Sequence, residues 1–355
     1  MMTDLILKNE ERAIFTLREL YSRYGYAPYK MSRFEEYDLY VRNKDFLVSD
    51  QIITFSGDRG KLMALKPDVT LSIVKNAPEE LGMVQKVYYN ENVYRDYREI
   101  LQAGLECVGD LGSYEIAEVA LLAAKSLEVL GESYVLDLSH MGLIEAVLDS
   151  CCVDKQKAME CLRRKNLHEL EAICGENRAA FDKLSALLRC HGGGEQLEEI
   201  KKVLTTPEEK TALNALAGLW QLLSSAGYDD HVRLDFSVGT SMGYYSGVVF
   251  KGYLAGIPAS VLSGGQYDKL PRKMGRKARA IGFAIYLDLL QGLYSREQEQ
   301  WVDTLILHDG TVDTAALTAA AEEAAKTGSI LVSRTIPKHQ SYRALIRFEK
   351  GVRQL

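Results

Sequence analysis

A long helical block separates two strand-rich parts of this chain and limits the folds that the sequence can adopt. Residues 141–228 follow a nearly continuous helical pattern, with breaks at CGEN, HGGG and TTPEE. β-Branched and aromatic residues concentrate on both sides of it, in runs such as YVLDLSH before the block and VRLDFSV after it. Strands, helices and strands in this order predict one antiparallel sheet domain that is interrupted by a helical insertion.

The same pattern divides the chain into four segments. They are residues 1–140 (first part of the sheet domain), 141–228 (helical insertion), 229–298 (second part of the sheet domain) and 299–355 (a short α/β tail). In the tail, two strand patterns flank a helical pattern over residues 314–325, which predicts a parallel strand pairing.

Local signals predict several elements of the first segment. Apolar residues at helical spacing predict a first helix that ends at Gly25. YDLYV is expected to be a strand, and GDRG between two alternating runs predicts a hairpin turn. Ser113 is expected to cap a helix that continues to Leu130.

Composition excludes several classes of protein. The chain is 47% hydrophobic and 26% charged, and it lacks the run of ~18 apolar residues that a membrane span requires. Its net charge of -6 argues against a protein that coats nucleic acid, because phosphates require a basic face. The six cysteines have no CxxC spacing and no leader pattern precedes them, so free thiols and a cytoplasmic location are expected, with no metal site.

Two glycine-rich stretches resemble catalytic motifs but lack their essential partners. The GDRGK sequence has no Ser or Thr after its lysine, which a phosphate-binding loop requires. HGGG is similar to the oxyanion glycines of some esterases, but the chain has no G-x-S-x-G elbow. The first stretch is therefore interpreted as a turn and the second as a glycine stop between helices.

Residues 86–109, KVYYNENVYRDYREILQAGLECVG, combine strand alternation with inward polar residues. The pattern predicts two strands around a charged turn and places Gln102 and Glu106 on the inner face among aliphatic neighbours. Each could be a hydrogen-bonded core residue, because buried polar groups are normally paired. Their position on one face also favours a binding pocket.

Five ordered blocks resemble the core of the histidyl-tRNA synthetases over about residues 1–295. They are LKPDVT (65–70), REILQAGLECVG (98–109), YYSGVVF (244–250), SGGQYDKL (263–270) and AIGFAIYLDLL (280–290). The resemblance implies an α+β, class II synthetase-like fold, with an antiparallel six-stranded sheet, flanking helices and the helical insertion. It also implies a dimer through the first helix and strand.

The resemblance further implies a histidine pocket. A selective site needs buried acceptors for the ammonium group and for both imidazole nitrogens. The matching residues are Asp68, Thr70 and Gln102 at the amino group, Glu106 and Tyr245 at the imidazole, and Tyr244 and Tyr267 in the wall.

The arginines that these synthetases direct at ATP are absent from the matching positions. Tyr88 and Tyr89 stand at the second motif, Leu289 at the third, and Thr240 near the arginine before the tyrosine pair. Guanidinium groups stabilise the charge that develops during phosphate chemistry, so adenylate formation is not expected and no catalytic residue is assigned. Arg95 and Arg98 are the candidates to bind the carboxylate of histidine in place of the missing arginine.

This combination resembles the histidyl-tRNA synthetase-like regulatory subunits of ATP phosphoribosyltransferase. The resemblance implies a non-catalytic, cytoplasmic subunit of a hetero-oligomer that activates a short-form catalytic subunit in the first step of histidine biosynthesis. It also implies L-histidine as the allosteric ligand, with no cofactor and no membrane or nucleic-acid partner.

Two other functions remain open. A divergent but active histidyl-tRNA synthetase is favoured by the pocket and opposed by the missing arginines. An RNA-binding synthetase-like module would need a basic face, for which KKV (201–203) and RKMGRKAR (272–279) are the short candidates. Both are typical of solvated helix faces or loops. Because the second lies near the pocket in the family, docking of an anionic surface is a hypothesis for it.

Overall fold

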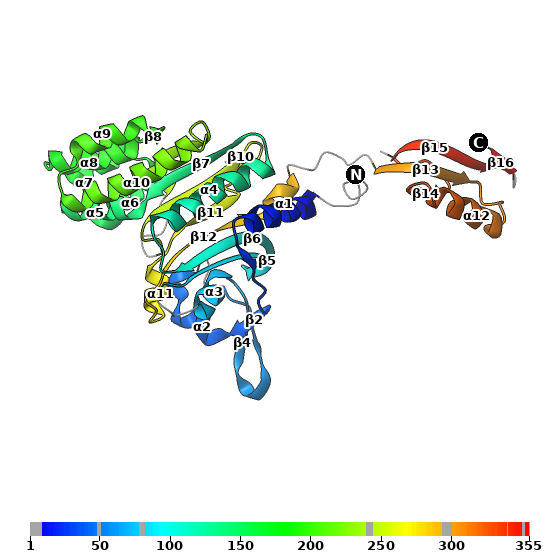
Figure 1. Cartoon of the computed structure of the whole chain (residues 1–355), viewed down its shortest axis with the longest axis horizontal. Helices are drawn as coiled ribbons and strands as arrows, with labels where there is room; N and C mark the ends of the chain where they lie inside the picture. Colours follow the sequence, from blue (N-terminus) through cyan, green and yellow to red (C-terminus); the bar gives the residue numbers. More distant parts are fainter. Residues whose placement is uncertain are drawn as a thin grey trace. The chain divides into compact units, whose positions relative to one another are not determined.

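The chain forms two compact units, Met1–Gly292 and Leu293–Leu355 (Figure 1). The computed structural model describes residues 9–47, 51–77, 82–238, 244–292, 300–338, 340–349 and 352–354. Within these ranges, none of the helices combines the length and the hydropathy that crossing a bilayer requires.

A nine-stranded sheet with the order β1-β5-β6-β12-β11-β10-β7-β9-β8 forms the centre of the first unit. Its six neighbouring strands from β5 to β7 pair antiparallel throughout, as predicted. These strands are β5 (Val84–Arg95), β6 (Arg98–Gly109), β12 (Arg279–Tyr286), β11 (Leu262–Gln266), β10 (Val248–Leu254) and β7 (Tyr134–His140).

The predicted count of six strands was wrong because short strands extend both edges. At one edge β1 (Ala27–Pro28) pairs parallel with β5. At the other, β9 (Val232–Asp235) pairs parallel with β7, and β8 (His191–Gly192) pairs antiparallel with β9. A strand of two residues is too short to produce a visible alternation. The first half of HGGG thus adds an edge strand as well as separating two helices.

Two helices pack on one face of this sheet, α1 (Asn9–Arg23) and α4 (Ser113–Leu130) (Figure 1). Tyr21 of α1 is buried, and its hydroxyl lies 2.9 Å from the Ser126 hydroxyl of α4. Gly25 follows α1 with φ +79°, the left-handed conformation that the sequence predicted for it. The N-terminus of α4 is capped one residue earlier than predicted, because Glu115 accepts a hydrogen bond from the Gly112 backbone N–H.

Six helices between β7 and β9 make up the insertion, in agreement with its helical pattern. They are α5 (Met141–Cys151), α6 (Lys155–Arg164), α7 (Leu167–Cys174), α8 (Arg178–Arg189), α9 (Glu195–Val203) and α10 (Pro207–Ser225). The six cysteines of the chain are free thiols, and five of them are buried.

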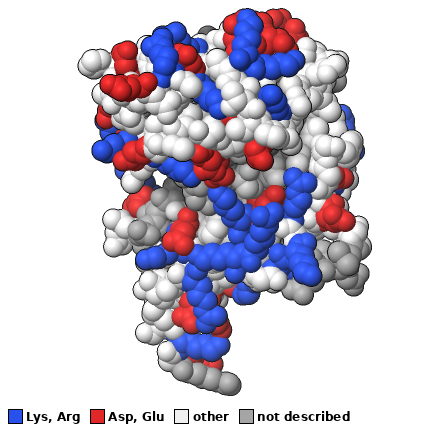
Figure 2. All heavy atoms as spheres, turned by 90° about the vertical axis from the view of Figure 1, so that its left-hand side faces the viewer, with Lys and Arg blue, Asp and Glu red and all other residues white. Residues whose placement is uncertain are grey.

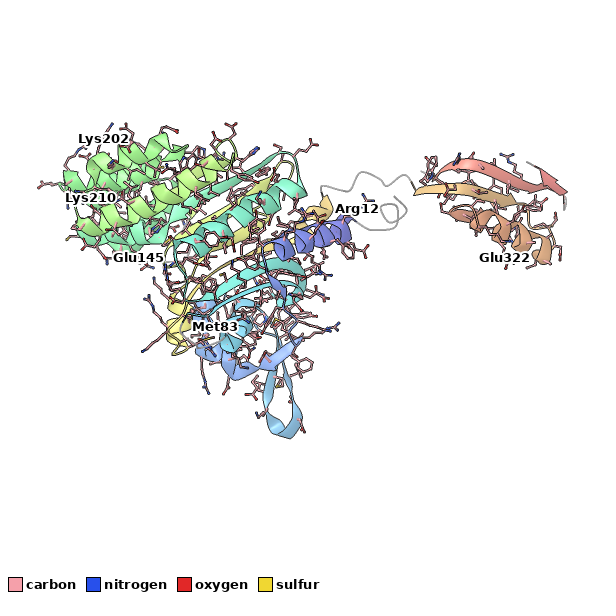
Figure 3. All side chains as sticks on the ribbon, in the orientation of Figure 1. Arg12, Met83, Glu145, Lys202, Lys210 and Glu322 are labelled. Atoms are coloured by element: carbon pink, nitrogen blue, oxygen red, sulfur yellow. The ribbon has the colours of Figure 1, made fainter. Side chains whose placement is uncertain are left out.

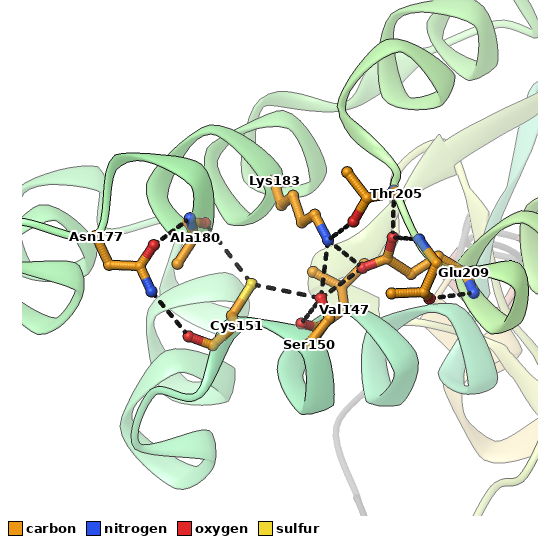
Figure 4. Close-up of polar contacts among 9 residues, drawn as sticks. Val147, Ser150, Cys151, Asn177, Ala180, Lys183, Thr205 and Glu209 are labelled. Carbon is orange, nitrogen blue, oxygen red and sulfur yellow. Dashed lines mark hydrogen bonds and ion pairs between the residues drawn. The ribbon is translucent and has the colours of Figure 1, made fainter.

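A buried polar network joins α5, α8 and α10 inside the insertion (Figure 4). The Lys183 ammonium lies 2.6 Å from the Glu209 carboxylate, and neither side chain is more than 8% exposed. The same carboxylate accepts hydrogen bonds from the Ser150 hydroxyl and from the Thr205 and Thr206 backbone N–H groups. One charged pair and the N-terminal cap of α10 therefore share a single glutamate.

A small three-stranded sheet precedes β5 and contains the predicted hairpin. Its order is β2 (Phe34–Glu36), β4 (Leu62–Leu65) and β3 (Thr54–Ser56), with GDRG connecting β3 and β4. YDLYV lies in α2 (Tyr37–Arg42), so the strand predicted there was wrong. Five residues are too few to distinguish one helical face from strand alternation, and this helix buries only Tyr40.

The second unit is a small α/β structure whose sheet has the order β14-β13-β15-β16. As predicted, α12 (Thr314–Ala325) connects two parallel strands, β13 (Gln300–His308) and β14 (Ile330–Ser333). The sequence did not predict β15 (Gln340–Glu349) and β16 (Val352–Gln354). Ile306, Ala320, Ile346 and Phe348 form its core.

Candidate functional site

A cavity of about 370 Å³ lies on the central sheet of the first unit. Side chains on a strand alternate between faces, and Gly252 of β10 lies against Leu127 of α4, so the cavity residue Lys251 points to the opposite face. All seven residues assigned to histidine by resemblance line this cavity: Asp68, Thr70, Gln102, Glu106, Tyr244, Tyr245 and Tyr267. They come from the start of α3 (Thr70–Asn76), from β6 and from the segments around β10 and β11.

Glu106 is the buried acceptor at the centre of this group. It is 2% exposed and accepts a hydrogen bond from the Thr70 hydroxyl at 2.8 Å and a second one from the Tyr267 hydroxyl. Burial raises the pKa of Glu106 to about 8, although these two hydrogen bonds oppose the change. Its cross-strand neighbour is Gly282, where a Cβ atom would overlap the carboxylate. Glycine at this position of β12 therefore leaves the space that Glu106 occupies.

Gln102 lies on the same face of β6 as Glu106, four residues away. Its side chain is 2% exposed, and no hydrogen-bond partner for Nε2 exists among the described residues. Leaving a buried polar group unpaired costs about 1–3 kcal/mol. A cavity-lining amide in this state indicates a ligand that brings a polar atom to it.

Asp68 places a second carboxylate at the same end of the cavity. One of its oxygens accepts a hydrogen bond from the Leu71 backbone N–H at 2.9 Å, in the first turn of α3. Burial raises the pKa of Asp68, and the positive charge of Arg95 and the backbone hydrogen bonds oppose this rise. Asp68 and Glu106 together give this end of the cavity an acidic character.

Three tyrosines form the aromatic wall. The Tyr244 ring packs edge-on against Tyr245 at 4.7 Å between centroids, and 5.7 Å separates it from Tyr267. Burial raises the pKa of all three hydroxyl groups. They are therefore neutral hydrogen-bonding groups on apolar rings, a combination suited to an imidazole.

Arg95 reaches the cavity, whereas Arg98 does not. Arg95 is 7% exposed and lines the cavity, where its Nε donates to the Pro67 carbonyl at 2.6 Å. Arg98 is exposed and is absent from the cavity lining, so of the two candidates for the ligand carboxylate the structure places only Arg95 at the cavity. The two residues pair across the end of the β5–β6 hairpin, but only Arg95 is buried and lines the cavity.

The turn between these strands is much shorter than the charged loop that the sequence suggested. β5 and β6 are each 12 residues long, and only Asp96 and Tyr97 connect them, with φ of 50° and 60°. Two consecutive positive φ values are typical of a type I′ hairpin turn. Tyr89, the residue expected to replace an arginine, is buried and donates to the Phe283 carbonyl at 3.5 Å.

The cavity has a second end that the sequence analysis missed. It is lined by Lys251, Ser260 and Ser263, and the cavity residues Ala284 and Tyr286 of β12 lie between this end and β6. In the sheet register Lys251 pairs with Ser263, and Ser263 pairs with Ala284, which places their side chains in one row. The available signal was the charge of Lys251 within the otherwise apolar run GVVFKGYL. Thr240 lies outside the described residues.

The two basic stretches differ in their surroundings. On α9, Lys201 and Lys202 lie 3.5 and 2.6 Å from glutamates of the same helix. Lys202 extends from the surface of the insertion (Figure 3), in agreement with a solvated helix face.

Residues 272–279 contribute to a more basic surface. Figure 2 shows a band of basic side chains on the face that includes α11 (Lys269–Lys273). Arg276 donates to the Ala77 and Lys75 carbonyls, so its guanidinium holds the fold together. Arg272 and Lys277 are exposed.

Comparison with known proteins agrees with this geometry. The model of the histidyl-tRNA synthetase family matches residues 6–290. An ATP phosphoribosyltransferase regulatory subunit from Halalkalibacterium halodurans is 30% identical over 301 residues, which cover 80% of this chain and 75% of the relative.

Solved structures share the fold. The crystal structure of an ATP phosphoribosyltransferase regulatory subunit/histidyl-tRNA synthetase from Bacillus halodurans superposes with a TM-score of 0.75 and 24% identity, over 96% of this chain and 93% of that one. A chain of the ATP phosphoribosyl transferase (HisG:HisZ) complex from Thermotoga maritima gives a TM-score of 0.63 and 19% identity, over 78% of this chain and 97% of that one.

The antiparallel sheet, its flanking helices and the pocket on its open face define a class II synthetase-like protein. Sequence similarity identifies the family within this class, since both the family model and the relative cover most of the chain. The chain belongs to the ATP phosphoribosyltransferase regulatory subunits, within the histidyl-tRNA synthetase family.

Proposed function

We propose that this chain binds and activates a short-form ATP phosphoribosyltransferase catalytic subunit and that L-histidine, bound in the cavity, reduces this activation. The first part is supported by the names of its relatives and by the fold shared with a chain of a two-component transferase complex. The observation that carries the second part is the buried Gln102 amide, whose Nε2 has no partner among the described residues and which shares a face of β6 with the Glu106 acceptor.

The cavity suits an amino acid better than a nucleoside triphosphate. Among its lining residues are two cationic side chains, Arg95 and Lys251, and three carboxylates, Asp45, Asp68 and Glu106. A triphosphate needs an excess of cationic donors, which this lining does not provide. Because only two residues connect β5 and β6, this hairpin provides no long loop that could cover a phosphate chain. These features argue against the alternative of an active synthetase.

Histidine matches the acidic end in charge and in hydrogen-bonding capacity. Its ammonium group can donate to Asp68 and to the neighbouring hydroxyl of Thr70, and its imidazole can pair with Glu106. A site that pairs every polar atom of its ligand rejects analogues that lack one, because a buried group then stays unpaired.

Ligand binding would connect parts of the chain that are distant in sequence. Thr70 lies at the start of α3, Glu106 lies on β6, and Tyr267 follows β11. Hydrogen bonds already join these three side chains around one carboxylate. Histidine could therefore favour one arrangement of the segments, and a coupling free energy of about 1–3 kcal/mol is sufficient for a several-fold to hundred-fold change in partner affinity.

We also infer that two exposed basic residues, Arg272 in α11 and Lys277 after it, dock an acidic surface of the partner. Replacing Arg272 and Lys277 together by glutamate should slow association about tenfold, since surface charges act mainly on the association rate. Association kinetics at low and high salt would measure this effect, with Lys202→Glu on α9 as the control. Arg276 is left unchanged because its replacement would disturb the fold. Equal association rates for both variants would remove the docking role.

The proposal as a whole predicts a specific activity result. The ATP phosphoribosyltransferase rate of the cognate short catalytic subunit should rise when this chain is added and should fall again as L-histidine is titrated. Activation without inhibition by histidine would refute histidine sensing alone. No activation at all would favour the tRNA-linked alternatives.

A further inference from the structure

The second end of the cavity contains a cation that faces the acidic end across the sheet. Lys251 lies on β10 and Glu106 on β6, with β12 and β11 between them. Neighbouring strands are about 4.8 Å apart, and Lys251 lies two residues beyond Val249, the β10 residue in register with Glu106, so roughly 16 Å separates the two backbone positions. The side chains of both residues line the same cavity and extend into it from different strands.

Lys251 has no fixed partner in the described part of the chain. No hydrogen bond or ion pair to its ammonium group is present there, and the carboxylate across the strand pair, Asp137, is bound by Arg233 at 2.9 Å. Burial lowers the pKa of Lys251, and Asp137 opposes the change only partly. The ammonium group of Lys251 is partly buried beside a carboxylate that Arg233 already binds, so an anion supplied from outside the chain would stabilise it.

Arg95, the other cationic residue of the cavity, is less available to bind an anion. Arg95 donates its Nε to the Pro67 carbonyl, and its charge interacts with the Asp68 carboxylate at the acidic end. An anionic group placed there would also approach Glu106. Lys251 is three strands away from that carboxylate, and the hydroxyl groups of Ser260 and Ser263 line the same end.

We propose that Lys251, with Ser260 and Ser263, forms an anion subsite that binds the carboxylate of the amino-acid ligand. The ligand then lies across the sheet, with its ammonium and imidazole groups at Asp68 and Glu106 and its carboxylate at Lys251. This assignment rests on the proposed function, because it deepens the description of the same cavity. It also explains how the chain can bind a free amino acid without an arginine at Tyr89.

The assignment is tested by comparing L-histidine with L-histidinol, in which a hydroxymethyl group replaces the carboxylate. Titration calorimetry on the full chain should show that the wild type prefers histidine by about 10- to 100-fold, as expected for a hydrogen bond to a charged group. In Lys251→Met the preference should disappear, because histidine affinity falls while histidinol affinity stays unchanged. Lys251→Arg should retain most of it.

Unchanged histidinol affinity also shows that the variant is folded. An equal loss of affinity for both ligands would overturn the proposal in favour of a purely structural lysine. A preference that persists in Lys251→Met and disappears in Arg95→Met would overturn it in favour of Arg95.

A second measurement tests the anion subsite independently of histidine sensing. Reductive methylation of the wild type, read by mass spectrometry, reports the accessibility of Lys251, with exposed Lys202 as the internal reference. If the wild type binds neither amino acid, histidine sensing fails, and inorganic phosphate alone is used as the probe. Protection of Lys251 by histidine or phosphate supports the anion subsite, and full reactivity at saturating concentrations of both overturns it.

Discussion

Replacing Glu106 by glutamine should weaken L-histidine binding by about 30- to 100-fold, the effect of removing a charged hydrogen-bond partner from a buried site. Glutamine has the same shape, and its carbonyl can still accept from Thr70 or Tyr267. The variant loses the negative charge that stabilises the cationic groups of the ligand. Titration calorimetry at pH 7.5 would measure the change.

The same carboxylate should couple histidine binding to proton release. Without ligand, burial raises the pKa of Glu106 to about 8, so the group is mostly protonated at pH 7. A bound ammonium or imidazolium group favours the charged carboxylate and lowers this pKa. Binding enthalpies measured near pH 7 should therefore vary with the ionisation enthalpy of the buffer, and this dependence should disappear in Glu106→Gln.

Glu106 is expected to make the free energy of unfolding fall as the pH rises, which is opposite to the effect of most carboxylates. Its pKa is raised above the ordinary value of 4.5, so its contribution to the free energy of unfolding is fully present below about pH 4.5. This contribution is lost as the pH rises through about 8. In the absence of ligand, Glu106→Gln should flatten the decline of stability between these pH values.

A matched control is Glu118, which is also buried but lies on α4 and binds Lys86 at 2.6 Å. Glu118→Gln should reduce stability and leave histidine affinity unchanged. Similar losses of affinity in both variants would mean that binding responds to general destabilisation, and Glu106 would then have no specific role in the pocket.

Strong local periodicity made much of this fold predictable. The longer antiparallel strands β5, β6, β7, β10 and β12 and the helices α4 and α12 each have enough residues for the repeat of apolar positions to be recognised. The two pocket residues on β6 were predictable from the same alternation. Gln102 and Glu106 are four residues apart, so their side chains point to the same face of the strand.

Features set by pairing or by tertiary packing were not predictable. The turn at Asp96 and Tyr97 uses two positive φ values without glycine or asparagine, so its sequence resembles a longer charged loop. The role of Lys251 depends on the register of β10 against β11, which brings residues from separate motifs into one row. Tyr89 was recognised as a departure from the family, but the position of Arg95 required the three-dimensional path of the hairpin.

The largest effect on stability is expected in the insertion, at Lys183. Replacing it by methionine should lower the free energy of unfolding by about 3–5 kcal/mol, because the change leaves the Glu209 carboxylate buried without its cation. Urea unfolding followed by circular dichroism would measure the loss. Lys202→Met is the control: its ion pair with Glu199 is about two-thirds exposed on both sides, and its removal should cost less than about 1 kcal/mol.

A double replacement separates the stability contributed by the buried ion pair from that contributed by the N-terminal cap of α10. Lys183→Met with Glu209→Leu removes both charges, and apolar residues of similar volume often substitute for a buried pair without loss. Glu209 also accepts the backbone N–H groups of Thr205 and Thr206, which leucine cannot do. The double variant should therefore recover most of the stability but remain about 1 kcal/mol below the wild type, the usual value of a helix cap.

The pH dependence of the Lys183 variant provides the most specific test. Burial would raise the pKa of Glu209, but its hydrogen bonds, with Lys183 foremost, lower it to about 2. In the wild type, its contribution to stability is present above about pH 4.5 and is lost as the pH falls toward 2. Without Lys183, the largest interaction that lowers this pKa is lost, so the pKa rises and the carboxylate is protonated at a higher pH than in the wild type. The stability deficit of Lys183→Met should then shrink between pH 7 and pH 4, whereas a constant deficit would show that the lysine contributes packing alone.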